Sequence, residues 1–217
     1  MKYVYKGALI FFLAIFLSFC SRAEPSVAYS FMQLVLYEDA AGNFVPHITF
    51  FVLATDDDGV EDIDEIRLYN DFEGLMWKVR SDEWTLLADG TNTWIGTKDF
   101  VMPASESVPN GEYRVVVIDK GGDQGSRTFG FDGVSQNRYP NPKLTIADGM
   151  YTIESLYPKN SFLCYNASGE YRNTFELSSK TGIVANLPFG GDIISVSLWA
   201  QDSENSISAL TRQKALR

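Results

Sequence analysis

Short segments rich in β-branched and aromatic residues recur along most of this 217-residue chain. Within them apolar and polar positions alternate with a period of two, and clusters of Gly, Asn, Asp and Pro separate them. Such segments are typical of β-strands joined by turns. No segment after the N-terminal apolar run has the 3.6-residue period of an amphipathic helix. The pattern therefore predicts an all-β fold.

Strands are expected on both sides of a turn-rich segment, 134–143, which contains two prolines and two asparagines. Before it, the predicted strands are 29–37, 47–54, 63–69, 75–80, 84–87, 93–101, 112–119 and 126–131. After it, they are 143–147, 150–157, 161–166, 171–178, 182–187, 192–201 and 206–212. The composition of the segment suits a connection between two domains.

The N-terminus has the pattern of an export signal. Lys2 and Lys6 precede an apolar run from Ala8 to Leu17, and small residues follow it. This arrangement predicts a signal peptide. The run is shorter than the roughly 20 apolar residues that a membrane-spanning helix needs. A permanent transmembrane anchor is therefore not expected.

The four residues LSFC, Leu17 to Cys20, resemble the lipobox of bacterial lipoproteins. The resemblance implies that residues 1–19 are removed and that Cys20 is acylated, which would anchor the chain to a bacterial membrane. Phe19 replaces the usual small residue, as in the looser lipoboxes of spirochaetes. Each buried methylene contributes about 0.8 kcal/mol, so several acyl chains give a stable anchor. Cleavage after Ala23 is the alternative, and it would release a soluble secreted or periplasmic protein.

Charge is distributed unevenly along the chain, whose net charge is −10. Without Lys2 and Lys6, 16 bases and 28 acids remain, a net charge of −12. Residues 24–132 carry 21 acids against 7 bases, whereas residues 134–217 carry 7 acids against 8 bases. This asymmetry indicates two units with different surfaces. Because an acidic unit repels phosphate backbones, nucleic acid is not an expected partner.

The residues needed for common enzyme mechanisms are scarce. The chain has two cysteines, Cys20 and Cys164, and one histidine, His47. If Cys20 is acylated or removed, Cys164 has no partner for an intramolecular disulfide, and its apolar surroundings predict an inert buried thiol. His47 begins an apolar strand, and no nucleophile elbow accompanies it. We therefore expect neither an enzyme nor a zinc site.

Three stretches have the pattern of sandwich hairpins. HITFFVLATDDDGVEDIDEIRLYND has an acidic Asp-Gly turn between two strands, and in PNGEYRVVVIDKGGDQGSRTFGF a Gly-Glu-Tyr sequence opens a strand. They resemble the B-to-C and F-to-G portions of bacterial immunoglobulin-like and fibronectin-III-like modules, and ISVSLWAQDSENSISALT resembles a second F-to-G hairpin. The resemblance implies that Tyr113 is a tyrosine corner, its hydroxyl bonded to the backbone a few residues upstream.

The resemblance and the turn-rich segment together predict two tandem immunoglobulin-like β-sandwich domains. After a signal peptide at 1–19 and a tether at 20–28, an acidic sandwich is expected at 29–133. A linker at 134–143 then leads to a smaller sandwich at 144–217.

The stretch ATDDDGVEDIDEI is crowded with carboxylates. Its flanks are strands, which excludes an EF-hand, whose loop lies between helices. In a sandwich the B-to-C and F-to-G loops lie at the same end, which brings Asp56, Asp57 and Asp58 toward Asp119 and Asp123. Such oxygen ligands suit Ca²⁺. The alternative is a solvated turn, because Asp and Gly favour turns and salt screens exposed carboxylates.

Tryptophans provide a second candidate site. Trp77 alternates in phase with Leu75 and Val79, so we expect it to face the core. Trp84 and Trp94 have no decisive phase. They either pack in the core or form a platform on which a sugar ring stacks.

These observations predict an exported, membrane-anchored lipoprotein of the cell envelope, of the spirochaete type. It would be a non-enzymatic binding or scaffolding protein that acts through immunoglobulin-like domains, with Ca²⁺ as a candidate stiffening ion. Its partner would be a protein or a glycan. The alternative is a carbohydrate-binding protein that uses exposed tryptophans.

Overall fold

The computed structural model describes residues 23–102, 107–133 and 135–216. Its regular structure consists of β-strands and short 3-10 helices, and the described residues contain no α-helix. The predicted all-β class is confirmed. Strands β4 (Leu75–Arg80) and β9 (Lys143–Ala147) begin and end where the alternating pattern places them, and only β16 (Lys214–Ala215) has no predicted counterpart.

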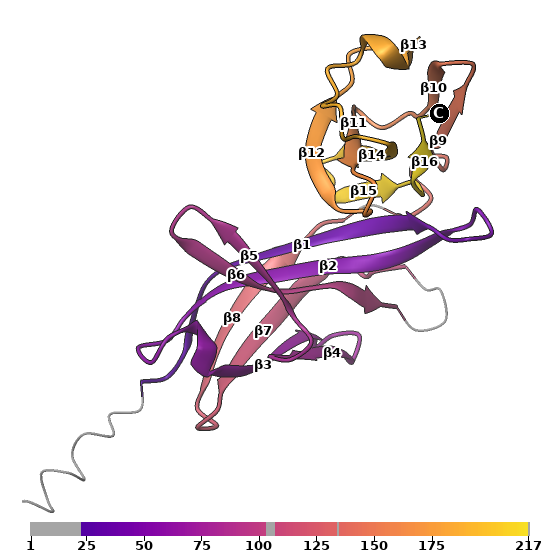
Figure 1. Ribbon diagram of the computed structural model, residues 1–217. Helices are drawn as coiled ribbons and strands as arrows, with labels where there is room; N and C mark the ends of the chain where they lie inside the picture. The colour runs from indigo at the N-terminus through magenta and orange to yellow at the C-terminus, as the bar shows by residue number, and fades with distance from the viewer. Residues whose placement is uncertain (1–22, 103–106, 134, 217) are drawn as a thin grey trace, which may run out of the picture.

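The strands form three sheets (Figure 1). The largest has nine strands in the order β12 (Tyr171–Glu176), β11 (Lys159–Tyr165), β14 (Ser195–Asp202), β15 (Ile207–Leu210), β1 (Ser26–Glu38), β2 (Phe44–Thr55), β6 (Asn92–Val101) and β5 (Thr85–Asp89), with β16 beside β14. The four-stranded sheet has the order β4, β3 (Ile63–Asn70), β7 (Gly111–Asp119) and β8 (Gln124–Phe131). The three-stranded sheet has the order β13 (Thr181–Ile183), β10 (Met150–Glu154) and β9.

Strand β1 joins the two halves of the sequence into one sheet. It pairs antiparallel with β2 over its whole length, and residues 34–37 pair in parallel with residues 207–210 of β15. The large sheet therefore runs through both parts and curls like half a barrel. For this reason the structure does not divide clearly into the two immunoglobulin-like sandwiches that the sequence predicts.

Most of the buried apolar side chains of the large sheet lie on one face. The four-stranded sheet packs on this face at β2 and β6, and the three-stranded sheet packs on it at β11 and β14, so that two apolar clusters are enclosed. A third cluster, which we call the junction cluster, lies between them. Its buried members are Leu34, Leu36, Tyr157, Ala200, Ile207 and Ala209. The junction cluster packs the two halves together, since it draws residues from both.

Two predictions about the first core are confirmed. The side chain of Tyr113 is fully buried, and its hydroxyl donates to the Pro109 carbonyl oxygen at 2.8 Å, as in a tyrosine corner. Burial raises the pKa of Tyr113, and a hydrogen bond with Asn70 opposes the shift. Trp77 stacks against Phe100 and Tyr113 on the core side of its strand.

The predicted linker, 134–143, is held against the body in its described part. Tyr139 donates to Asp202 Oδ2 at 2.7 Å, and its ring centroid lies 4.4 Å from that of Tyr157. Asp202 ends β14, and Tyr157 belongs to the junction cluster. The connection between the two halves is therefore fastened to the place where the halves meet.

Candidate functional site

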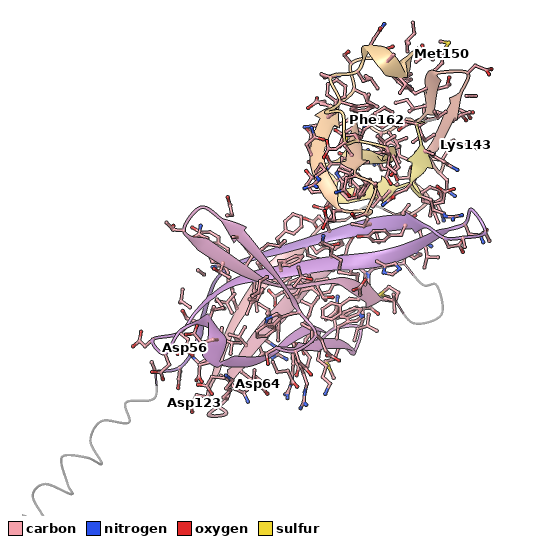
Figure 2. The ribbon with its side chains drawn as sticks, viewed as in Figure 1. Asp56, Asp64, Asp123, Lys143, Met150 and Phe162 are labelled. Atoms are coloured by element: carbon pink, nitrogen blue, oxygen red, sulfur yellow. The ribbon has the colours of Figure 1, made fainter. Side chains whose placement is uncertain are left out.

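Three carboxylates converge at the end of the first half where the described chain begins. Asp56 follows β2, Asp62 ends the 3-10 helix Val60–Asp62, and Asp119 ends β7. One oxygen atom of each lies within 4.8 Å of the others, and we call these residues the carboxylate cluster. Asp119 is buried and the other two are half-buried. Figure 2 labels Asp56 and Asp123 at this end of the molecule.

Local hydrogen bonds shape the loop between β2 and β3. The Asp58 amide donates to Asp56 Oδ1 at 2.9 Å, and the Gly59 amide donates to the Asp56 carbonyl at 3.1 Å. Gly59 has a φ of +99°, a conformation that favours glycine. The Asp62 amide then donates to the Gly59 carbonyl at 3.0 Å. This turn folds Asp62 back beside Asp56.

The turn between β7 and β8 is tied to this loop. The Asp123 amide donates to Asp119 Oδ1 at 2.8 Å, which closes the turn. The Lys120 amide donates to the Asp62 carbonyl at 2.8 Å, and Lys120 Nζ donates to the Glu61 carbonyl at 2.7 Å. Because these bonds link the two turns, the carboxylates are held together by the backbone.

The charges of the carboxylate cluster are not neutralised by side chains. Within the part of the chain that the structure describes, none of its members forms an ion pair with Lys or Arg. Asp56 Oδ2 and Asp123 Oδ2 are also buried and lack a hydrogen-bond partner. Carboxylates this close repel one another unless a cation or a proton lies between them. Their oxygens are the ligands that Ca²⁺ prefers, so the arrangement can hold a divalent cation.

The structure brings together only part of the predicted calcium site. Asp56 and Asp119 meet, as expected of loops at one end of a sandwich. Asp57 and Asp58 are exposed, and both they and Asp123 lie outside the cluster. Asp62 takes part although the sequence did not distinguish it from the other acids of its stretch. Only the 3-10 turn shows that it folds back, so no pattern in the sequence could have identified it.

The carboxylate cluster lies next to the start of β1. Ser26 pairs with Thr55, the residue before Asp56. β8 passes close to this start at Gly125, where a Cβ atom would overlap the Pro25 carbonyl oxygen, so glycine is required there. The cluster and the N-terminal end of the body are therefore neighbours.

A groove of about 560 Å³ opens on the face of the large sheet that is turned away from the apolar clusters. Phe31 lies opposite Phe51, and Leu87 lies opposite Trp94, in neighbouring strands. The lining residues are Phe31, Thr49, Phe51, Leu87, Ala88, Asp89, Trp94 and Lys98. Apolar walls with a few polar groups are typical of ligand sites.

The two tryptophans predicted as a platform lie in different places. Trp84 is half-buried and packs against the first apolar cluster. Trp94 is half-buried and lines the groove. Phe31, with 47% of its side chain exposed, shares the groove and was missed. Alternation along β1 separates its two faces but does not show which face another sheet covers.

Glu65 forms a separate ion cluster on the four-stranded sheet. Arg67 Nε donates to Glu65, and the ammonium of Lys78 and the guanidinium of Arg80 lie 3.8 and 3.5 Å from the same carboxylate. Burial acts to raise the pKa of Glu65, but the hydrogen bond and charges of these neighbours outweigh it, and the pKa is lowered. Glu65 is therefore held ionised, which does not suit a catalytic acid.

The candidate nucleophile and base of the sequence lie far apart in the fold. Cys164 is fully buried in the C-terminal cluster, and burial raises the pKa of its thiol to about 11. The predicted burial is confirmed, and the inertness of the thiol stays a prediction, which the raised pKa supports because the reactive thiolate is scarce at neutral pH. His47 lies in β2, with its ring centroid 5.0 Å from that of Tyr37 and its Nδ1 4.0 Å from Asp99.

Comparisons with known proteins give a fold likeness only. No protein-family model and no curated protein matches the chain. Tp47, the 47-kilodalton lipoprotein of Treponema pallidum, has a TM-score of 0.45 and 12% identity over 90% of this chain and 52% of Tp47. The BSP domain of a biofilm associated protein has a TM-score of 0.29 and 11% identity over 87% of this chain and 29% of that protein. Dimeric latent PorU from Porphyromonas gingivalis has a TM-score of 0.34 and 12% identity over 89% of this chain and 20% of PorU. The chain thus spans about half of Tp47 and less of the other two, and it resembles bacterial lipoprotein and surface-protein domains without a family assignment.

The membrane-related predictions rest on the N-terminus. Cys20 and the signal peptide 1–19 lie outside the described residues. Among the described residues, no helix has the length and apolar character needed to cross a bilayer.

Proposed function

We propose that this chain is an exported lipoprotein of the bacterial cell envelope, acylated at Cys20, that acts as a non-enzymatic binding and scaffolding protein. The observation that carries the proposal is the position of β1. It begins at Ser26, six residues after Cys20, and it pairs with both β2 and β15. Six extended residues span at most about 20 Å. A lipid on Cys20 would therefore hold the first half close to a membrane. The second half would be joined to it through the same sheet, farther along β1 at residues 34–37.

The shared sheet suits a rigid spacer. Bending between the halves would break the ladder between β1 and β15 and expose the junction cluster, whose residues Ala200, Ile207 and Ala209 are fully buried. Both changes are unfavourable, because apolar surface and backbone hydrogen-bonding groups would meet water or lose their partners. We regard the two halves as immunoglobulin-like units fused through this sheet. The tyrosine corner and the β14–β15 hairpin support that interpretation.

The decisive measurement for the tether is the intact mass of the mature chain. Acylation predicts a chain that begins at Cys20 and carries the mass of a diacylglyceryl group and a further acyl chain. A Cys20→Ser variant should lose this mass and leave the membrane fraction. A mature chain that begins at Glu24 would show that the protein is released, and the tether would be wrong.

The carboxylate cluster fits this proposal as a Ca²⁺ site that stiffens the end nearest the tether. Calcium that binds only the folded chain adds roughly 2.7 kcal/mol at one hundred times its dissociation constant. For a chain of this length that raises the melting temperature by about 5–11 °C. Asp62→Asn should abolish the rise, whereas Asp57→Asn, which changes an exposed acid outside the cluster, should preserve it. No rise at millimolar calcium would exclude the cation site and leave the tether untouched.

A glycan ligand is the second candidate function, and the groove beside Trp94 favours it. Aromatic rings at Trp94 and Phe31 can stack on sugar faces, while Asp89 and Lys98 offer polar contacts. Polysaccharide pull-down and quenching of tryptophan fluorescence test this candidate. Trp94→Ala should abolish both signals, whereas a variant in which Trp84 is replaced by Phe should keep them. Equal binding by the Trp94→Ala variant and the parent chain would exclude the groove.

A further inference from the structure

Among the described residues, strand β5 forms a free edge of the large sheet. All five of its residues, Thr85–Asp89, are exposed, and Leu86 and Leu87 have exposed fractions of 60% and 40%. In Figure 1 the hairpin of β5 and β6 projects from the sheet at the upper left. An unpaired strand edge with apolar side chains is a template for another strand. β5 therefore has the properties of a docking edge.

The other edge strands of five residues or more carry charges that discourage such pairing. Arg172 lies in β12, Lys78 in β4, Arg127 in β8 and Lys143 in β9. Charged side chains on an edge strand are a common protection against unwanted strand addition. β5 has the sequence TLLAD, and its one charge, Asp89, lies at the hairpin turn. β9 likewise has its one charge, Lys143, at its end, but β9 also lies against β14 and β16. Among the described edge strands of five residues or more, β5 has neither a charge at its centre nor such a neighbour.

The register of the hairpin determines which backbone groups of β5 are free. Asp89 pairs with Asn92 across a two-residue turn. The turn hydrogen bond makes these two residues a hydrogen-bonded pair, and such pairs alternate with non-hydrogen-bonded pairs along an antiparallel ladder. The N–H and C=O groups of Leu86 and Ala88 therefore point toward the open edge.

We infer that β5 pairs with β5 of a second copy of this chain, in an antiparallel arrangement whose two-fold axis passes between the two Leu87 residues. In this register Leu86 of one copy exchanges backbone hydrogen bonds with Ala88 of the other. Asp89 lies opposite Thr85 and does not face another carboxylate. The arrangement pairs the whole strand, and both copies use the same surface, as a two-fold dimer requires. A shifted register would shorten the ladder and place Asp89 opposite a leucine or beyond the partner strand.

The apolar groove supports a second copy as the partner. Leu87 lies opposite Trp94 within the hairpin, so the two-fold pairing would extend the apolar wall from Trp94 through both Leu87 side chains to the Trp94 of the second copy. Leu87 would then be covered by Leu87 of the other copy, and Leu86 would lie beside its Ala88. Five paired residues on each side make a small contact, so the dimer is weak and depends on concentration.

Salt should strengthen this dimer. Residues 24–132 carry 21 acids against 7 bases, so two copies repel each other at long range. Salt screens that repulsion, over about 8 Å at physiological ionic strength, whereas the apolar and backbone contacts of β5 do not depend on charge. A dimer held together by contacts between opposite charges would instead weaken as the salt concentration rises. The sign of the salt effect therefore separates the two kinds of interface.

Disulfide trapping tests the register directly. Residues 24–217 contain every described strand, and in that chain buried Cys164 is the single native cysteine. Leu87→Cys should give a covalent dimer on mild oxidation, because non-hydrogen-bonded antiparallel pairs have Cα atoms about 4.5 Å apart. Leu86→Cys alone should form little dimer, whereas a mixture of the Leu86→Cys and Ala88→Cys chains should cross-link.

Sedimentation of the same 24–217 chain tests the dimer without cross-linking. We expect dimers to appear as the concentration rises toward about 1 mM, the weak end of specific association. Leu87→Glu should weaken the dimer at least tenfold, since two carboxylates would meet at the two-fold axis. Leu156→Glu is the matched control, because Leu156 is 65% exposed and lies outside the strands, so it should leave the dimer unchanged.

Three results would overturn the inference. The first is a chain that stays monomeric at every concentration. The second is a dimer that Leu87→Glu does not weaken although the variant melts like the parent chain. The third is cross-linking of Leu87→Cys that is no faster than that of Leu156→Cys. None of these outcomes bears on acylation at Cys20, so the dimer and the tether are tested separately.

Discussion

Replacement of Ile207 by alanine tests the shared sheet. The Ile207 side chain is fully buried in the junction cluster, and its backbone pairs with Leu34 of β1. The buried neighbours Ala200 and Ala209 have small side chains, which cannot move in to fill the space that Ile207→Ala leaves. The substitution therefore opens a cavity where the two halves meet.

The expected loss of stability is large. Replacing a buried isoleucine by alanine costs about 2–5 kcal/mol, and the cost increases with the cavity that remains. Because two of the buried neighbours are alanines, which fill little of the cavity, we expect about 4 kcal/mol. In a chain of this length each kcal/mol lowers the melting temperature by about 2–4 °C, so the melting temperature should fall by about 8–16 °C.

Native-state hydrogen exchange followed by mass spectrometry shows whether the loss spreads. If the halves form one cooperative unit, amides of β3 and β7 lose protection together with those of β15. Val117→Ala makes the reverse test, because Val117 is fully buried in the core of the first half. In one cooperative unit this substitution should lower the exchange protection of amides in the second half. Loss of protection confined to residues 143–216 in Ile207→Ala would refute the reasoning, because the halves would then unfold separately.

Three further predictions follow from single contacts. Tyr113→Phe leaves the Pro109 carbonyl without its donor and should reduce the free energy of unfolding by about 1–3 kcal/mol in urea titration, whereas an unchanged midpoint would contradict the tyrosine corner. Hydrogen bonding to Tyr139 is the main cause that lowers the pKa of Asp202. This hydrogen bond stabilises the folded chain fully above the unfolded pKa of Asp202, and the stabilisation is lost as the pH falls through the folded pKa. Asp202→Asn should therefore flatten the dependence of folding stability on pH below about pH 4. An unaltered dependence would count against the contact. Because the thiol of Cys164 has a pKa of about 11, iodoacetamide should modify it at pH 8 only when the chain unfolds, and rapid modification of the folded chain would show that it is accessible.

The carboxylate site was predictable in its location but not in its members. Asp-rich turns at the ends of strands placed acids at one end of the sandwich, and the structure brings Asp56 and Asp119 together there. The contribution of Asp62 and the exposure of Asp57 and Asp58 depend on how the 3-10 turn folds back. Spacing along the chain does not encode that path, because several Asp residues of the stretch could occupy the turn positions that Asp favours.

The groove illustrates the same limit for the tryptophans. The alternation of β4 placed Trp77 in the core correctly, since its neighbours in phase are apolar. Trp84 comes directly before β5, and Trp94 lies in β6. One packs against the first apolar cluster and the other lines the groove, because the four-stranded sheet covers only one face of the curled sheet. That is a property of packing and not of either strand.

For this protein the sequence alone determined the all-β class, nearly every strand, the tyrosine corner and the buried thiol, because each depends on alternation or chemistry within a few residues. Only the tertiary structure decided that β1 pairs with β15 as well as β2, and that one sheet therefore runs through both halves. Strand alternation shows which side chains share a face, but the unpaired N–H and C=O groups of every strand are chemically alike. The partner that a strand edge takes is decided by long-range packing, here by the junction cluster around Ile207.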